Sequence, residues 1–155
     1  MNRFHLRIFL LFLLLCSYGI IAQTAQRVEY RAVKYKSNVD APLTNDELTK
    51  IKEVYKQSTE DVILNDKAHL KRIKHLLRNR IKILKLGIKD QHRRHTLLSE
   101  VELFNHFNPN LTRDLVFDKY GFNPLKYNLN LYPSENILYR IDGTNYYIRI
   151  MSQFQ

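Results

Sequence analysis

The fold class is decided by residues 136–151, which read NILYRIDGTNYYIRIM. Apolar and polar residues alternate on both sides of Asp142-Gly143, and a period of two is typical of a half-buried β-strand. Asp-Gly between two such runs is the strongest short-range signal for a β-hairpin. A two-residue loop would place Tyr139 opposite Tyr146, so that apolar residues face apolar residues. The sequence therefore predicts an antiparallel hairpin that turns at Asp142-Gly143.

The residues just before the hairpin carry the same period. At 125–132 the chain reads LKYNLNLY, in which Leu and Tyr alternate with Lys and Asn, and Pro133-Ser134 then supplies a turn. This pattern predicts a further strand beside the hairpin. The expected sheet is a three-stranded antiparallel meander, with strands at about 125–132, 136–141 and 144–151.

The first half of the chain has the spacing of amphipathic helices. Thr44 and Glu47 stand at the two positions of a capping box, in which each side chain bonds the other residue's backbone N–H, so a helix is expected at about 45–64. A second run of apolar residues recurs at steps of three and four and predicts a helix at about 67–86. Gly87 suits the left-handed residue that ends many helices. The apolar residues of this second run are Leu70, Ile73, Leu77, Ile81, Leu84 and Ile88.

A third, shorter helix completes the expected fold. Ser99 and Glu102 repeat the capping-box spacing and predict a helix at about 100–107. The resulting fold class is α+β: an αα-hairpin and the short helix pack on one face of the meander, because a three-stranded sheet needs such a cover. We expect a single domain over 44–155, preceded by an extended lead-in at 23–43.

The first 22 residues have the pattern of a secretory signal peptide. Arg3 and Arg7 precede an apolar run that ends near small residues. The run is shorter than the roughly 20 residues of a bilayer-spanning helix, so an uncleaved anchor is the weaker alternative and a buried helix the weakest. Cleavage after Ala22 would remove Cys16, the only cysteine, and leave a mature chain without disulfides, thiol chemistry or a transmembrane span. We therefore expect an exported protein that is periplasmic, envelope-associated or secreted.

The ending Ile21-Ala22-Gln23 resembles export signals that are common in Bacteroidota. The C-terminal segment is also similar to those of small exported proteins from that group with no assigned activity. The resemblance implies export and a C-terminal β-meander. It carries no catalytic motif, so it implies no site residue.

The positive charge of the chain is concentrated in one segment. The formal net charge is +10, from 25 Lys and Arg against 15 Asp and Glu. Eleven of the cations lie between Lys67 and His95, where Asp90 is the only acid. Like charges four residues apart destabilise a helix by about 0.2–0.5 kcal/mol per pair. The segment therefore calls for a compensating partner.

Several partners could compensate these cations. Acids of the predicted helix at 45–64 could neutralise them within the molecule, while an anionic lipid surface or an acidic protein could do so from outside. Nucleic acid is disfavoured by export and because residues 67–95 contain no Phe, Tyr or Trp to stack on bases. The same lack of aromatic residues argues against deep membrane insertion. The residues expected to bind an anionic surface as diffuse charge are Lys71, Lys74, Arg78, Lys82 and Lys85.

Other chemistry finds little support in the sequence. Four of the six histidines lie in the basic segment, where neighbouring cations oppose a divalent metal. The acids Glu100/Glu102 and Asp114/Asp118 are read as helix-start and loop residues, and no phosphate loop, dinucleotide fingerprint or H-E-x-x-H motif is present. We expect no catalytic residue, metal or cofactor. The expected function is that of an exported, non-catalytic interaction module in the envelope or periplasm; the alternatives are an exported hydrolase with a scattered site, or a subunit of an envelope assembly.

Overall fold

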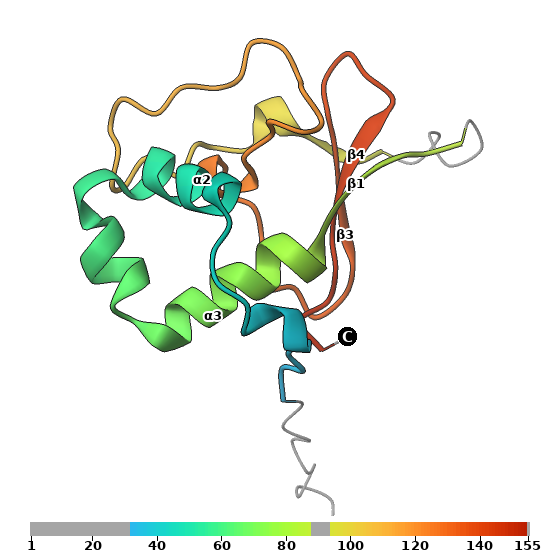
Figure 1. The fold of residues 1–155 in the computed structure, drawn as a ribbon. Coiled ribbons are helices and arrows are strands. Elements are labelled where there is room, and N and C mark those ends of the chain that lie inside the picture. Colours follow the sequence, from blue (N-terminus) through green and yellow to red (C-terminus); the bar gives the residue numbers. More distant parts are fainter. Residues whose placement is uncertain (1–31, 88–93, 155) are drawn as a thin grey trace, which may run out of the picture. The chain divides into compact units, whose positions relative to one another are not determined.

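The computed structural model describes residues 32–87 and 94–154 of the chain (Figure 1). The expected signal peptide at 1–22, the first part of the expected lead-in and part of the basic segment, 88–93, lie outside the described residues. Residues from Ala32 onward belong to one structural unit. This unit is mixed α+β, so the fold class expected from the sequence is confirmed at that level.

The sheet differs from the expected meander. It has four strands in the order β1-β4-β3-β2, and β4 pairs antiparallel with both β1 and β3 while β2 runs parallel to β3. The expected three-stranded antiparallel sheet is therefore wrong, and only its hairpin, β3 with β4, is present. The strands are β1 Ile81–Lys85, β2 Thr96–Leu97, β3 Ile137–Arg140 and β4 Tyr146–Ile150.

Strand β1 occupies the end of what the sequence predicted as a helix at 67–86. The helix α3 covers only Lys67–His75 and continues as a π-helical turn over Leu76–Arg80. Two isoleucines of β1, at 81 and 83, pack against the core while Lys82 is exposed, so a period of two replaces the helical period. Gly87 does not end a helix: of the described glycines, Gly143 has the positive φ.

The helix expected at 45–64 begins as predicted and breaks early. The hydroxyl of Thr44 accepts from the Glu47 backbone N–H at 3.2 Å, and the Thr44 N–H donates to the Glu47 carboxylate at 2.9 Å, which confirms the capping box. The helix α2 then spans Asn45–Tyr55 and ends where Lys56 adopts a φ of 47°. A 3-10 turn over Lys56–Ser58 and a π-helical turn over Thr59–Leu64 complete the segment.

The short helix expected at 100–107 is wrong, because Ser99 bonds elsewhere. Its N–H and hydroxyl donate to the two carboxylate oxygens of Asp142, at 2.9 and 2.5 Å, and so tie this segment to the β3–β4 turn. A 3-10 turn over Leu98–Glu100 takes the place of the helix. Leu103 beyond it forms an antiparallel bridge with Tyr127.

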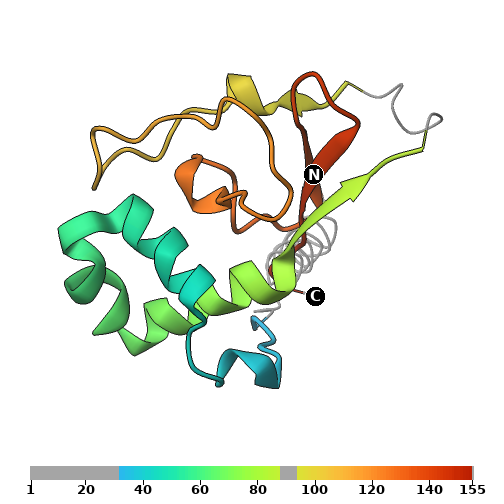
Figure 2. The same ribbon diagram turned by 45° about the horizontal axis from the view of Figure 1, so that its top comes forward.

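The strand expected at 125–132 is also wrong, and burial alternates as expected only from Tyr127 to Asn130, because Lys126 is 3% exposed. Pro124–Lys126 forms a 3-10 turn, which lies beside α2 (Figure 2). Tyr127 and Leu129 are buried and Asn128 and Asn130 exposed, as alternation predicts. The segment does not pair with β3 as the meander requires, because β3 already pairs with β2 on one side and with β4 on the other.

The β3–β4 hairpin turns at the predicted place with a longer loop. Tyr139 lies opposite Ile148 and not opposite Tyr146, and the Ile141 N–H bonds the Tyr146 carbonyl at 3.0 Å. The register is therefore shifted by two residues, which leaves every side chain on its expected face. The Thr144 hydroxyl explains the longer loop, because it donates to the Ile141 carbonyl and accepts from the Tyr146 N–H.

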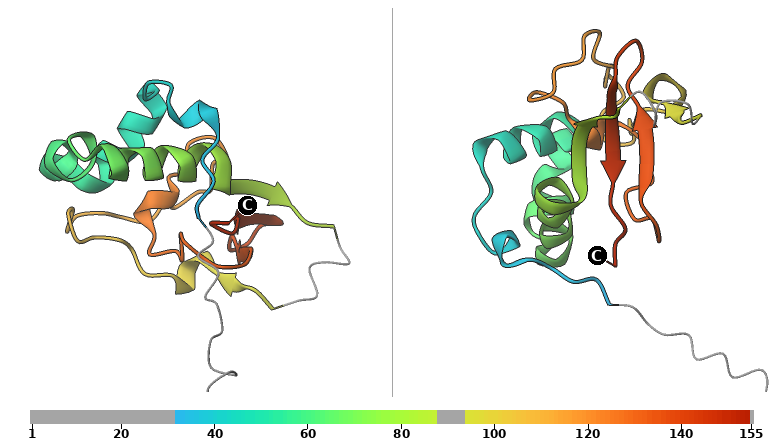
Figure 3. Two further views of the ribbon diagram at one scale, coloured as in Figure 1. Left: turned by 90° about the horizontal axis from the view of Figure 1, so that it is seen from below. Right: turned by 90° about the vertical axis from the view of Figure 1, so that its right-hand side faces the viewer.

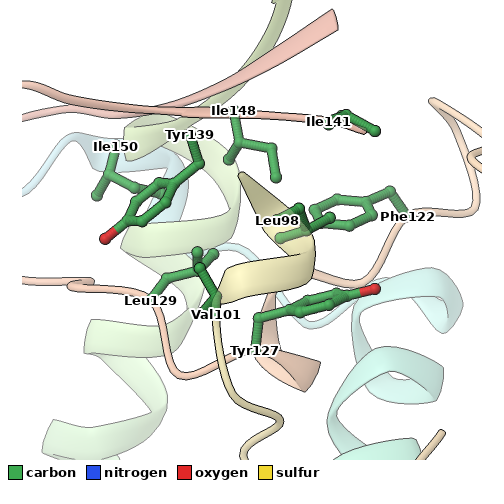
Figure 4. Close-up of a cluster of buried hydrophobic side chains, with 9 residues drawn as sticks. All are labelled: Leu98, Val101, Phe122, Tyr127, Leu129, Tyr139, Ile141, Ile148 and Ile150. Carbon is green, nitrogen blue, oxygen red and sulfur yellow. The ribbon is translucent and has the colours of Figure 1, made fainter. Parts of the chain in front are cut away.

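Two apolar clusters form the core. The first lies between the inner face of the sheet and the segments 98–103 and 122–131 (Figure 4), and the rings of Phe122 and Tyr127 stack in it at 5.5 Å. The second joins α2 and α3 to Leu125. Both clusters lie on one side of the sheet, so its other side is not covered by α2 or α3.

Candidate cationic site

The five cations expected to bind an anionic surface lie on three different elements. Lys71 and Lys74 belong to α3, Arg78 to the π-helical turn, and Lys82 and Lys85 to β1. Because the helix ends before β1, these side chains do not share a helical face. Whether each cation is available to a partner therefore depends on the residues around it.

Arg78 is bound within the molecule. Its Nε and Nη2 donate to the two carboxylate oxygens of Glu47 at 2.6 and 2.7 Å, and the guanidinium also donates to the carbonyls of Asn38, Ala41 and Pro42. Five donors are the full capacity of a guanidinium in this arrangement. Arg78 thus joins the lead-in segment to the start of α2 and is not available to a partner.

The charge states of this pair follow from the contacts. Burial would raise the pKa of Glu47, but hydrogen bonds from Arg78 and Thr44, together with the charge of Arg78, outweigh burial and lower the pKa. The hydrogen bond to Glu47 raises the pKa of Arg78 in turn. Both groups are therefore ionised at neutral pH. The sequence left open whether acids of the helix expected at 45–64 neutralise the clustered cations. For Arg78, Glu47 does so.

The two lysines of α3 are also less available than expected. Lys74 is only 8% exposed. The ammonium of Lys71 lies 3.5 Å from the carboxylate of Asp40 and 5.1 Å from the ring centre of Tyr35. The Lys71–Asp40 pair is exposed, and pairs of this kind contribute about 0–1 kcal/mol.

The two lysines of β1 point to opposite faces of the sheet. Lys85 shares the inner face with Ile81 and Ile83, and its ammonium lies 4.8 Å from the ring centre of Tyr146. Lys82 is exposed on the outer face, directly opposite Arg149 of β4. Of the five predicted residues, Lys82 is the exposed cation that has no ion pair or ring contact within the described residues.

The outer face of the sheet brings further cations to Lys82. Alternation and register place Arg149 of β4 and Arg140 of β3 on the same face. Neither arginine has an ion pair within the described residues, and the four strands contain no acid. Seen from the side, α2 and α3 do not lie over this face (Figure 3, right). We call Lys82, Arg140 and Arg149 the cationic sheet face.

The cationic sheet face has an electrostatic cost. Like charges directly opposite each other on neighbouring strands are destabilising, and Lys82 and Arg149 are such a pair. Arg140 lies diagonally from Arg149, at the i, j±2 position, where residues are typically about 7–8 Å apart. An anion bound between these side chains would relieve the repulsion.

Sequence reasoning missed Arg140 and Arg149. The sequence did contain the information needed to place Arg140. Alternation in the hairpin puts Ile137, Tyr139 and Ile141 on one face of the sheet and Arg140 on the other. What the sequence concealed was that 81–85 is a strand beside β4, which brings Lys82 to the arginines. The five predicted residues therefore supply one member of the cationic sheet face.

Three of the four acids considered for catalysis, Glu100, Asp114 and Asp118, have structural contacts. Asp114 bonds the buried ammonium of Lys126 at 2.5 Å, and Asp118 accepts from the backbone N–H groups of Tyr120 and Gly121. The Glu100 carboxylate accepts from the Leu97 N–H. Within the described ranges, no three His, Cys, Asp or Glu side chains are grouped to hold a metal ion. None of the helices described is long and apolar enough to cross a bilayer.

Comparison with known proteins yields no relative: no family model matches the chain, and no curated protein or solved structure matches it significantly.

Proposed function

We propose that this protein is an exported, non-catalytic interaction module of the cell envelope whose cationic sheet face lies against an anionic lipid surface. The observation that carries the proposal is the direct opposition of Lys82 and Arg149, joined by Arg140, on a face without acids. Three adjacent cations with no ion pair in the described part of the chain are best neutralised from outside.

The shape of the face supports a surface as the partner. The cations stand on neighbouring strands of one sheet, so they can meet a layer of headgroups together. A Lys or Arg close to an anionic membrane contributes about 1 kcal/mol. The three side chains would then contribute about 3 kcal/mol, which corresponds to roughly a hundredfold in affinity.

The apolar residues of the face favour contact with headgroups over insertion. Leu84 and Leu138 are half-buried and Tyr147 is fully buried, with its ring 5.3 Å from that of His95. Insertion usually depends on exposed aromatic or apolar side chains. Binding should therefore come from charge and respond to charge substitutions.

The test is binding of the full chain to sedimented vesicles of phosphatidylcholine with and without about one third phosphatidylglycerol. The variant Lys82→Gln/Arg140→Gln/Arg149→Gln should bind anionic vesicles about a hundredfold more weakly than the wild type. The control variant Lys52→Gln/Lys67→Gln/Lys119→Gln removes the same charge from exposed positions outside the face and should change affinity less than threefold.

The apolar run at 8–22 is identical in all variants, so differences between them report on the charges alone. Equal loss of binding in the two triple variants would mean that net charge, and not the cationic sheet face, attracts the membrane. Equal binding of the wild type to neutral and anionic vesicles would overturn the proposal.

A further inference from the structure

A pocket of about 250 Å³ lies where the lead-in segment, α3, the π-helical turn and the C-terminal segment meet. It contains two arginines, a histidine and two tyrosines, and no acid lines it. It is separate from the cationic sheet face, because Lys82, Arg140 and Arg149 do not line it. The side chains that matter here are those of Tyr35, Arg72, His75, Arg80, Tyr132 and Gln153.

Arg80 brings a buried charge to this pocket. It is 3% exposed, and its Nε and Nη2 donate to the Met151 carbonyl at 3.2 and 2.9 Å. No carboxylate of the described residues pairs with it. A buried guanidinium normally has an ionised partner, because a neutral carbonyl does not balance its charge. The remaining N–H groups of Arg80 are therefore donors that a bound anion could occupy.

His75 adds a buried donor without a partner. It is 2% exposed, and the side-chain amide nitrogen of Asn79 lies 3.2 Å from its Nδ1. Asn79 is itself fixed by reciprocal bonds of 2.9 Å with the amide of Asn38. Because an amide nitrogen donates, Nδ1 is the acceptor and Nε2 carries the hydrogen of the neutral ring. That Nε2 is buried and has no hydrogen-bond partner in the described structure.

The charged side chains that line the pocket are both cationic. Burial lowers the pKa of His75, and the charges of Arg80 and Lys36 lower it further. Arg72 stands at the exposed rim with no ion pair in the described region. Two rings complete the lining: the ring centre of Tyr35 is 5.0 Å from that of His75, and the ring centre of Tyr132 is 5.5 Å from the Arg80 guanidinium.

We propose that this pocket binds a phosphate group through Arg72, Arg80 and the Nε2–H of His75. Guanidinium groups match phosphate oxygens in geometry and charge, and a neutral imidazole N–H adds a third donor. A buried donor left without a partner in a native fold calls for an explanation, and a bound anion supplies one for both His75 and Arg80. The pocket is several times larger than the roughly 30 Å³ of one water, so it also accommodates a substituent beside the two tyrosines.

The test follows the ring protons of His75 by NMR while inorganic phosphate is added to the full chain. Phosphate should perturb this resonance saturably and raise the pKa of His75, since a bound anion opposes the effect of Arg80 and Lys36. Arg72→Gln, a substitution at an exposed position, should weaken phosphate binding at least tenfold. The control is Lys67→Gln, which removes the same charge from the same helix outside the pocket and should leave the affinity unchanged.

A second variant addresses the buried donor. His75→Gln should weaken phosphate binding at least fivefold, measured by calorimetry, with folding checked by circular dichroism. If it fails to fold, Arg72→Gln still decides the question. Titration with glycerol 3-phosphate identifies the source of the group: tighter binding than inorganic phosphate indicates a phosphomonoester, and equal or weaker binding indicates free phosphate.

The proposal is overturned if phosphate gives no saturable change at His75, or if Arg72→Gln and Lys67→Gln weaken binding equally. These outcomes do not depend on vesicle binding, because the probes are soluble and the variants leave the cationic sheet face unchanged.

Discussion

At the scale of single residues, the contact of Arg78 with Glu47 determines which of the clustered cations is neutralised internally. The sequence predicted Glu47 as a capping residue, and that role is confirmed. It did not predict that the same carboxylate also accepts hydrogen bonds from Arg78, which lies 31 positions further along the chain. Local capping chemistry depends on spacing and can be read from sequence, whereas this long-range pair depends on how α2 and the π-helical turn pack.

Replacing Arg78 with Ala should destabilise the protein by about 3 kcal/mol at pH 7, because it leaves the buried Glu47 carboxylate without its partner. The pKa of Glu47 is lowered in the folded protein, so the stabilisation is present above the unfolded pKa of about 4.3 and lost as the pH falls through the folded pKa. The difference between variant and wild type in urea unfolding should therefore shrink in acid.

Lys71→Ala is the matched control, since its exposed pair with Asp40 contributes at most about 1 kcal/mol. If the two substitutions destabilise the protein equally, or if the effect of Arg78→Ala is the same well below pH 4.3, the pair does not have the role assigned to it.

At the scale of elements, the start of α2 and the hairpin could be predicted, whereas the end of α3 could not. The run Ile81-Lys82-Ile83-Leu84-Lys85 fits a helical stripe and also an alternating strand. Tertiary pairing decides between them, because β4 has a free edge that β1 fills. The segment 125–132 fails for the opposite reason: it alternates, but β2 occupies the edge of β3 beside which the meander would place it.

Cysteines at Lys82 and Arg149, in a Cys16→Ser background, should form a disulfide on mild oxidation. Residues directly opposite each other on neighbouring strands have Cβ atoms about 4.5–5.5 Å apart, close to disulfide geometry. The Lys82→Cys/Leu138→Cys chain should not crosslink, since Leu138 lies one strand beyond Arg149. Mass spectrometry of non-reduced peptides detects the disulfide in either double-cysteine variant. Crosslinking in the second chain alone, or in neither, would contradict the assignment of β1.

At the scale of the whole molecule, composition correctly located the charge but not its arrangement. The excess of Lys and Arg over acids, and its concentration after Lys67, follow from counting. The fold then divides the cations: Arg78 is paired, Lys74 and Arg80 are buried, and Lys82 joins two arginines from the hairpin. The sequence pattern alone cannot predict which cations are paired, buried or exposed, because this depends on the strand order and on long-range contacts.

The salt dependence of vesicle binding tests whether the cationic sheet face attracts an anionic surface. Screening shortens the reach of exposed charges from about 10 Å at 0.1 M salt to about 3 Å at 1 M. We predict that the wild type's affinity for phosphatidylglycerol vesicles falls at least tenfold between these salt concentrations, while that of the Lys82→Gln/Arg140→Gln/Arg149→Gln variant changes little. Parallel salt dependence in the two proteins would mean that the cationic sheet face is not what attracts the membrane.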